Sequence, residues 1–142
     1  MYERLSHVAE KVVMRAEIFA DELGQEYVGT EHLLLAMMVQ DKQDTGQILT
    51  RFGLTATTLR TRVEQLIKEQ LSDSFVVGTL PSTPHLQHVM ANGVKWARRL
   101  KADAVGTRHL LLAVIEEEGS VGQAALEDLG VDLDKLKTDL TG

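Results

Sequence analysis

The chain repeats itself with a step of 77 residues, and this internal repeat limits its fold more than any other feature. The stretch GTEHLLLAM begins at Gly29, and its near-copy GTRHLLLAV begins at Gly106. The same step relates Val12 to Val89, Ala20 to Ala97, Leu23 to Leu100, Leu49 to Leu126, Gly53 to Gly130 and Leu59 to Leu136. Because one register holds across both halves without a gap, we interpret the chain as a duplicated unit.

The two copies divide the chain into a first repeat at about 6–70 and a second at about 83–140. Between them lies LSDSFVVGTLPS, residues 71–82, whose Gly, Pro and Ser content is typical of a linker. A length of 142 residues suits one domain. We therefore expect the repeats to pack on each other, with pseudo-two-fold symmetry, as a single domain over residues 1–142.

Helical periodicity runs through both repeats, and no segment shows sustained alternation with a period of two. The pattern predicts an all-α fold with four helices in each repeat. Gly53 and Gly130 are placed to end the third helix of each repeat with a left-handed residue. The fourth helix is expected to begin after Thr55 in the first repeat and after Asp132 in the second.

Hydroxyl side chains stand where the first and second helices of each repeat should begin. Ser6 and Thr83 are expected to cap the first helices, and Pro84 suits the first helical position that follows Thr83. Thr30 and Thr107, inside the quoted motif, are expected to cap the second helices. The LLLA run that follows them is expected to be buried.

Composition excludes several functional classes. Hydrophobic residues make up 44% and aromatic residues 4%, which indicates an aliphatic core. Cysteine is absent, no secretory leader is recognisable, and no apolar run is long enough to span a membrane. The net charge of −6 disfavours nucleic-acid binding. The basic segment KWARRLK, residues 95–101, is interpreted as a solvated helix face with Trp96 in the core.

Recognisable catalytic and metal-binding motifs are also missing from the sequence, which contains no GxxxxGK[ST], GxSxG or HExxH. His32 beside Glu31 could act as a general base, but a histidine repeated as His109 is better explained as a packed residue that bonds the backbone. His85 and His88 could share a metal, but no third ligand stands at a suitable spacing. We therefore expect no catalytic residue, no metal and no cofactor.

The candidate binding residues lie at the helix starts, because free backbone N–H groups and a hydroxyl together bind anions. They are Ser6, Thr30 and Glu31 in the first repeat, with Thr83 and Arg108 in the second. The Glu31 carboxylate could accept a guanidinium group. The simpler alternative is that these residues only cap helices.

The duplicated motif resembles the N-terminal domain of the Clp AAA+ unfoldases, and is most similar to the ClpC type. The resemblance covers nearly the whole chain, from YERLSHVAEKV through STPHLQHV to VGQAALEDLGVDLDKL. It implies a double four-helix fold that recognises adaptors and unfolded or tagged client proteins without catalysis. The ATPase rings, which feed a ClpP-type peptidase, would then lie in other domains.

In ClpC-type domains the resemblance also implies binding of phosphorylated arginine. The hydroxyl and backbone amides of the helix cap would hold the phosphate, and the motif glutamate would hold the guanidinium. Carried onto this chain, the first pocket would combine Ser6 with Glu31, and the second would combine Thr83 with Arg108. The cation of Arg108 would repel a guanidinium, so at most the first pocket keeps the full chemistry.

Three functions therefore remain open at this point. The favoured one is an adaptor- and substrate-recognition module of a Clp unfoldase, in the cytoplasm or, in a plant, in the plastid stroma. The alternative is a standalone accessory protein that docks on a Clp peptidase complex. The third is a small hydrolase that uses His32 and Glu31.

Overall fold

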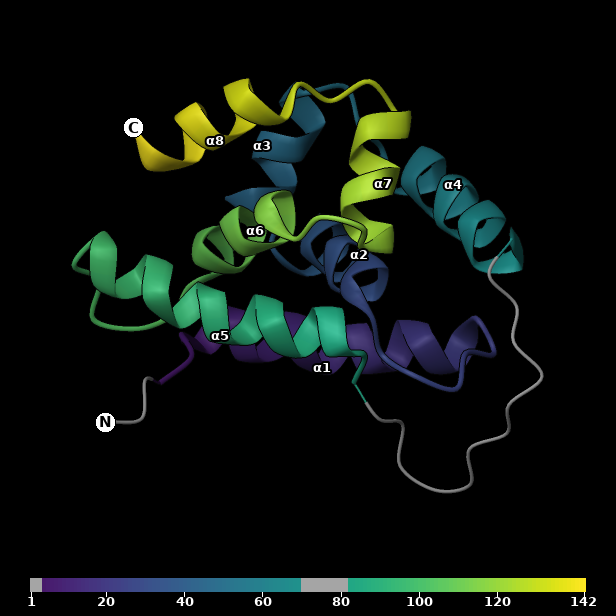
Figure 1. Cartoon of the computed structure of the whole chain (residues 1–142), viewed down its shortest axis with the longest axis horizontal. Helices are drawn as coiled ribbons and strands as arrows, with labels where there is room; N and C mark the ends of the chain where they lie inside the picture. Colours follow the sequence, from purple (N-terminus) through teal and green to yellow (C-terminus); the bar gives the residue numbers. More distant parts are fainter. Residues whose placement is uncertain (1–3, 70–81) are drawn as a thin grey trace.

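The computed structural model describes residues 4–69 and 82–142, which form eight α-helices joined by loops and turns (Figure 1). The first repeat contains α1 (His7–Glu22), α2 (Thr30–Gln40), α3 (Thr45–Arg51) and α4 (Ala56–Glu69). The second contains α5 (Pro84–Arg99), α6 (Thr107–Glu116), α7 (Val121–Asp128) and α8 (Leu133–Thr141). The expected all-α fold of two four-helix repeats is confirmed. The predicted linker lies, apart from Ser82, outside the described residues.

Local signals in the sequence account for most helix boundaries. The Ser6 Oγ atom accepts a hydrogen bond from the Ala9 N–H at 3.1 Å, and the Thr83 Oγ1 atom accepts one from the Leu86 N–H at 3.0 Å. Both predicted caps are therefore confirmed. The helices α3 and α7 are each followed by a glycine with positive φ, 93° at Gly53 and 82° at Gly130, as predicted.

The second helix of each repeat is capped differently from the prediction. Gly29 and Gly106, rather than Thr30 and Thr107, are the N-cap residues of α2 and α6. The backbone N–H of each glycine donates a hydrogen bond to the Nδ1 atom of the histidine three residues later. The distance is 2.9 Å for Gly29 and His32 and 2.8 Å for Gly106 and His109. The expectation that these histidines bond the backbone is confirmed, and the assignment of the threonines as caps is wrong.

The helices α2 and α6 lie at the centre of the molecule, where the LLLA run of each motif forms the core. Their leucines, Leu33, Leu34, Leu35, Leu110, Leu111 and Leu112, are at most 2% exposed. A helix that is apolar on every side must be buried on every side, which explains their central position. Burial of each such leucine contributes roughly 1.5–3 kcal/mol to folding. Trp96 is buried as well, as expected for the KWARRLK segment.

Short backbone pairings cross from one repeat to the other. Leu5, just before α1, forms an isolated parallel bridge with Val105, just before α6. The equivalent bridge in the other direction joins Val28, before α2, to Ser82, before α5. The first helix of each repeat is therefore anchored at its start to the motif of the other repeat.

The threonines of the two motifs also bond across the repeats. The Thr30 Oγ1 atom accepts a hydrogen bond from the Gly122 N–H at the start of α7, at 2.8 Å. A Cβ atom at position 122 would lie 2.8 Å from this oxygen, so only glycine fits the contact. The Thr107 hydroxyl bonds the buried Oδ2 atom of Asp41, after α2, at 2.5 Å. That oxygen also accepts from the N–H and the hydroxyl of Thr45, at 3.1 and 2.7 Å.

Substitution of Asp41 by alanine should destabilise the domain by about 3 kcal/mol, because it leaves three buried donors without an acceptor. Urea unfolding followed by circular dichroism measures the loss. The exposed Asp103→Ala variant is the matched control and should change stability by less than about 0.5 kcal/mol. Equal stability of the two variants would contradict the role given to Asp41.

Candidate functional site

The two candidate sites at the helix starts are assembled from both repeats. The Ser6 N–H donates to the Val105 carbonyl oxygen at 2.8 Å, which places Ser6 beside the motif that contains Arg108. The Thr83 N–H donates to the Val28 carbonyl oxygen at 2.9 Å, which places Thr83 beside the motif that contains Glu31. The expected pairing of Ser6 with Glu31, and of Thr83 with Arg108, is therefore wrong.

The antiparallel course of α1 and α5 makes this exchange visible (Figure 1). The two helices run in opposite directions, so their N-terminal ends do not meet. We call the combination of Glu31 and Thr83 the Glu31 site, and the combination of Arg108 and Ser6 the Arg108 site.

The Glu31 site contains a buried carboxylate without a full set of partners. The Glu31 side chain is 1% exposed, and its Oε2 atom has no hydrogen-bond partner within residues 4–69 and 82–142. A Cβ atom at position 29 would lie 2.9 Å from the carboxylate carbon, so the absence of a side chain at Gly29 makes room for this group. A buried acceptor without a donor is unfavourable, and a cationic ligand group would relieve the cost.

Burial raises the pKa of Glu31 to about 7. A contact with its own backbone N–H and the electrostatic effect of His85, on α5, both act in the opposite direction and only reduce this rise. Burial and the charge of Glu31 together raise the pKa of Tyr27. Tyr27 and His85 therefore lie close enough to Glu31 to interact with its charge.

The Arg108 site has a different chemical character. The Arg108 side chain is 45% exposed, and its Nε atom donates to the carboxylate of Asp44 at 2.8 and 3.1 Å. Asp44 lies before α3, and its counterpart in the second repeat is Val121. The cation is thus already paired within the chain, and among the described residues the Glu31 site has no equivalent ion pair.

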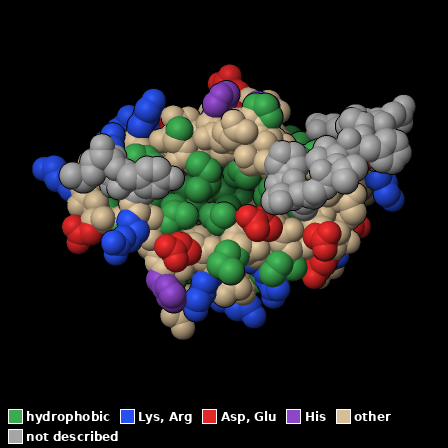
Figure 2. Space-filling view, turned by 90° about the horizontal axis from the view of Figure 1, so that it is seen from below, with side chains coloured by type: hydrophobic (Ala, Val, Ile, Leu, Met, Phe, Trp, Pro, Cys, Tyr) green, Lys and Arg blue, Asp and Glu red, His purple; other side chains and the backbone are tan. Residues whose placement is uncertain are grey.

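A hydrophobic groove of about 440 Å³ lies between α1 and α5, the first helices of the two repeats. Figure 2 shows hydrophobic side chains gathered at the centre of this face, with charged side chains around them. The lining residues are Val13, Ala16, Glu17, Val28, Leu33, Ser82, Leu86, Gln87 and Met90. We call this feature the α1–α5 groove.

His32 is poorly placed for acid–base chemistry. Its Nδ1 atom caps α2, and its Nε2 atom is buried without a partner in the part of the chain that the structure describes. Burial lowers the pKa of His32 to about 4. A general base works best with a pKa near the operating pH, so His32 does not fit that role.

A cluster that the sequence did not reveal contains His85, His88 and Glu117. Glu117 lies 32 and 29 residues beyond the two histidines, outside any short metal-binding motif. Spacing alone could not supply this third ligand, because it comes from the end of another helix.

Two interleaved four-helix repeats with a groove between their first helices define an all-helical double-repeat domain. The model of the Clp repeat N-terminal domain matches residues 4–122 and 83–142. The chain therefore belongs to this family, as the resemblance in its motifs predicted.

Curated relatives match almost the whole chain. A ClpA homolog, an ATP-binding subunit of an ATP-dependent Clp protease from Cyanidium caldarium, is 36% identical over 140 residues, 99% of this chain. Chloroplastic chaperone protein ClpC1 from Oryza sativa subsp. japonica is 33% identical over 138 residues, 97% of this chain. The chain spans only 16% and 15% of the lengths of these two relatives.

Solved structures share the fold at lower identity. The N-terminal domain of ClpD from Arabidopsis thaliana matches with a TM-score of 0.82 and 20% identity, over 96% of this chain and 92% of that one. A ClpV N-domain in complex with a VipB peptide matches with a TM-score of 0.69 and 18% identity, over 94% and 82%. Within residues 4–69 and 82–142, no helix is long and apolar enough to cross a membrane.

Replacement of Glu31 by glutamine should change how stability depends on pH. Glu31 keeps its proton in the fold up to about pH 7 but loses it near pH 4.5 when unfolded, so its contribution to stability falls as the pH rises between these values. Glu31→Gln should match the wild type at pH 4.5 and exceed its stability by about 2–3 kcal/mol at pH 8.

Urea unfolding at several pH values tests this expectation, with the exposed Glu10→Gln variant as the control that should follow the wild type. The contribution of His32 is the same in each protein and cancels in the difference. A Glu31→Gln difference that stays constant from pH 4.5 to pH 8 would disprove the shifted pKa.

Proposed function

We propose that this chain is the non-catalytic recognition module of a Clp unfoldase and that it binds adaptors and unfolded or tagged client proteins. Membership of the Clp N-terminal domain family supports the class of function. The α1–α5 groove is the observation that carries the proposal, because it offers a hollow apolar surface between the two repeats. The complex of a ClpV N-domain with a peptide shows that a domain of this fold can bind one.

The ATPase rings and a ClpP-type peptidase would be indirect partners, reached through other domains of a longer protein. The relatives include chloroplastic proteins, so the compartment would be the plastid stroma in a plant and the cytoplasm elsewhere. We propose no nucleic-acid partner, no membrane partner and no cofactor for the recognition function.

Phosphorylated arginine on a client is the finer ligand that we propose for the Glu31 site. Glu31 would accept the guanidinium, which would supply the donors that its Oε2 atom lacks. The phosphate would lie at the start of α5, where Thr83 stands and where the positive end of a helix of 16 residues favours an anion. The buried carboxylate must turn outward for this contact.

The Arg108 site would not take the same ligand. Its cation repels a guanidinium, and Asp44 already occupies its Nε donor. Thr30, the remaining candidate, is buried, and its hydroxyl is bonded to Gly122. Its role in binding would be to hold the start of α2 in place.

Calorimetric titration with free phospho-arginine tests the ligand and the crossed arrangement together. We expect binding at one site. Its affinity should fall at least about 30-fold in Glu31→Gln, because a charge-assisted hydrogen bond is removed. Thr83→Ala should weaken binding. The equivalent cap variant Ser6→Ala, and Arg108→Gln, should bind as the wild type does.

Weaker binding in Ser6→Ala than in Thr83→Ala would contradict the crossed site, and two equal sites would contradict the role given to Arg108. Free arginine is the ligand control for the phosphate. Absence of binding at millimolar phospho-arginine would reject this ligand and leave the groove as the recognition surface.

A charge placed in the α1–α5 groove should reduce client binding. Met90→Asp adds a carboxylate to the apolar lining, and we expect at least tenfold weaker binding of a fluorescently labelled, permanently unfolded protein, measured by anisotropy. Met14→Asp is the matched control, since Met14 is 64% exposed on α1 and does not line the groove. Equal losses in both variants would show that general charge, rather than the groove, controls binding.

A further inference from the structure

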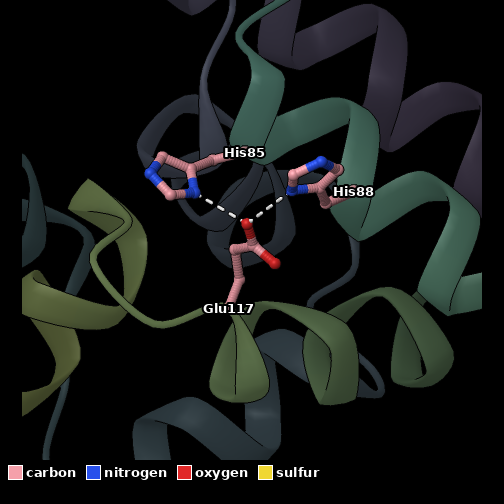
Figure 3. Close-up of side chains that lie close together, drawn as sticks. All are labelled: His85, His88 and Glu117. Atoms are coloured by element: carbon pink, nitrogen blue, oxygen red, sulfur yellow. Dashed lines mark hydrogen bonds and ion pairs between the residues drawn. The ribbon is translucent and has the colours of Figure 1, made fainter.

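Two histidines and one glutamate, residue types that can ligate a metal, meet at one point in the second repeat (Figure 3). His85 and His88 project from α5, and Glu117 is the C-cap residue that follows α6. The Nδ1 atoms of the two histidines lie 2.7 and 3.1 Å from the same Glu117 oxygen, Oε2. All three ligand atoms lie within 4.8 Å of one another.

The backbone holds this arrangement in place. His85 and His88 are three residues apart on a helix, so they are neighbours on one face. The Glu117 N–H bonds the Val114 carbonyl, and the Glu117 carbonyl accepts the Ser120 hydroxyl at 2.8 Å. The backbone positions of the two histidines are therefore fixed by α5, and that of Glu117 is fixed by the end of α6. Only adjustment of the side chains is needed to admit an ion.

The donor set is that of a transition-metal site. Two imidazole nitrogens and one carboxylate oxygen bind Zn²⁺ in many proteins, with ligand atoms about 3.4 Å apart in tetrahedral geometry. The two observed separations are shorter than this by less than an ångström, so small rotations would open the space. A carboxylate accepts hydrogen bonds, so the Nδ1 atoms are the donors in these two contacts. An ion bound at Nδ1 would take the place of those protons, and each imidazole would then carry its proton on Nε2.

Solvent access also suits an ion. The side chains of His85 and His88 are 45% and 66% exposed, while that of Glu117 is only 12% exposed. The carboxylate therefore lies at the base of a site that is open to solvent on the side of the two histidines.

The first repeat shows that the fold does not require this cluster. The equivalent positions, 77 residues earlier, carry Val8, Lys11 and Gln40, which cannot form such a site. The same helix pair forms there without any of the three ligands. The cluster is therefore a specific feature of the second repeat and is not needed to join a first helix to a second.

We propose that His85, His88 and Glu117 bind one divalent transition-metal ion, with Zn²⁺ as the fitting example. Three protein ligands leave the fourth tetrahedral position open, to be filled by water or by a side chain of a bound protein. Mg²⁺ and Ca²⁺ are not expected to bind, because they prefer oxygen ligands. The inference concerns a new site and does not depend on the proposed recognition function.

Calorimetric titration of the chelator-treated chain with ZnCl₂ tests the site. We expect saturable binding of one ion, weakened at least about tenfold in His85→Asn and in Glu117→Gln. His7→Asn is the matched control, because His7 is an exposed histidine at the start of α1. Titration with MgCl₂ should give no saturable heat.

A second measurement keeps the test independent of variants that fail to fold. Long-range ¹H–¹⁵N spectra of the wild-type imidazoles should show that Zn²⁺ shifts the Nδ1 signals of His85 and His88 and leaves those of His7 unchanged. No saturable binding at millimolar Zn²⁺ would overturn the proposal. It would also be overturned if folded variants bound as the wild type does, or if the His7 signals shifted equally.

Discussion

The rest of the structure depends on the pairing of short backbone segments across the two repeats. The bridges between Leu5 and Val105, and between Val28 and Ser82, fix the start of each first helix against the motif of the other repeat. The bond from Gly122 to Thr30 and that between Thr107 and Asp41 extend this exchange into the core. These contacts decide which residues can meet at the helix starts.

Duplication has left the two helix-start sites chemically different within one symmetric frame. One holds the buried Glu31 carboxylate, one oxygen of which has no partner among the described residues, and the other holds Arg108 paired with Asp44. The shared frame is maintained by identical features, such as the capping bonds of His32 and His109. Both repeats therefore use the same stabilising contacts at their helix starts, while the functional groups at the two sites differ.

The helices could be predicted from the sequence because their signals are local. Cap hydroxyls, positive-φ glycines and apolar periodicity each act within a few residues, and Ser6, Thr83, Gly53 and Gly130 stand where they were expected. Thr30 was misassigned as a cap because the histidine that does the capping lies two residues further on.

The pairing of sites could not be predicted, because a symmetric repeat looks the same whether its helix starts meet within a copy or across copies. The contact of Thr83 with Val28 is a tertiary contact between the repeats, and the 77-residue sequence repeat does not indicate it. Glu117 was missed for a related reason, since its distance from His85 in the sequence says nothing about their distance in space.

The crossed construction gives the Glu31 site a mechanical character. Its carboxylate belongs to one repeat and the start of α5 belongs to the other, so a ligand that touches both would tie the halves together. Binding to the joined state alone must then oppose their separation by the free energy of binding. A bound ligand at this site would act as a clamp and make the domain harder to pull apart when force is applied along the chain.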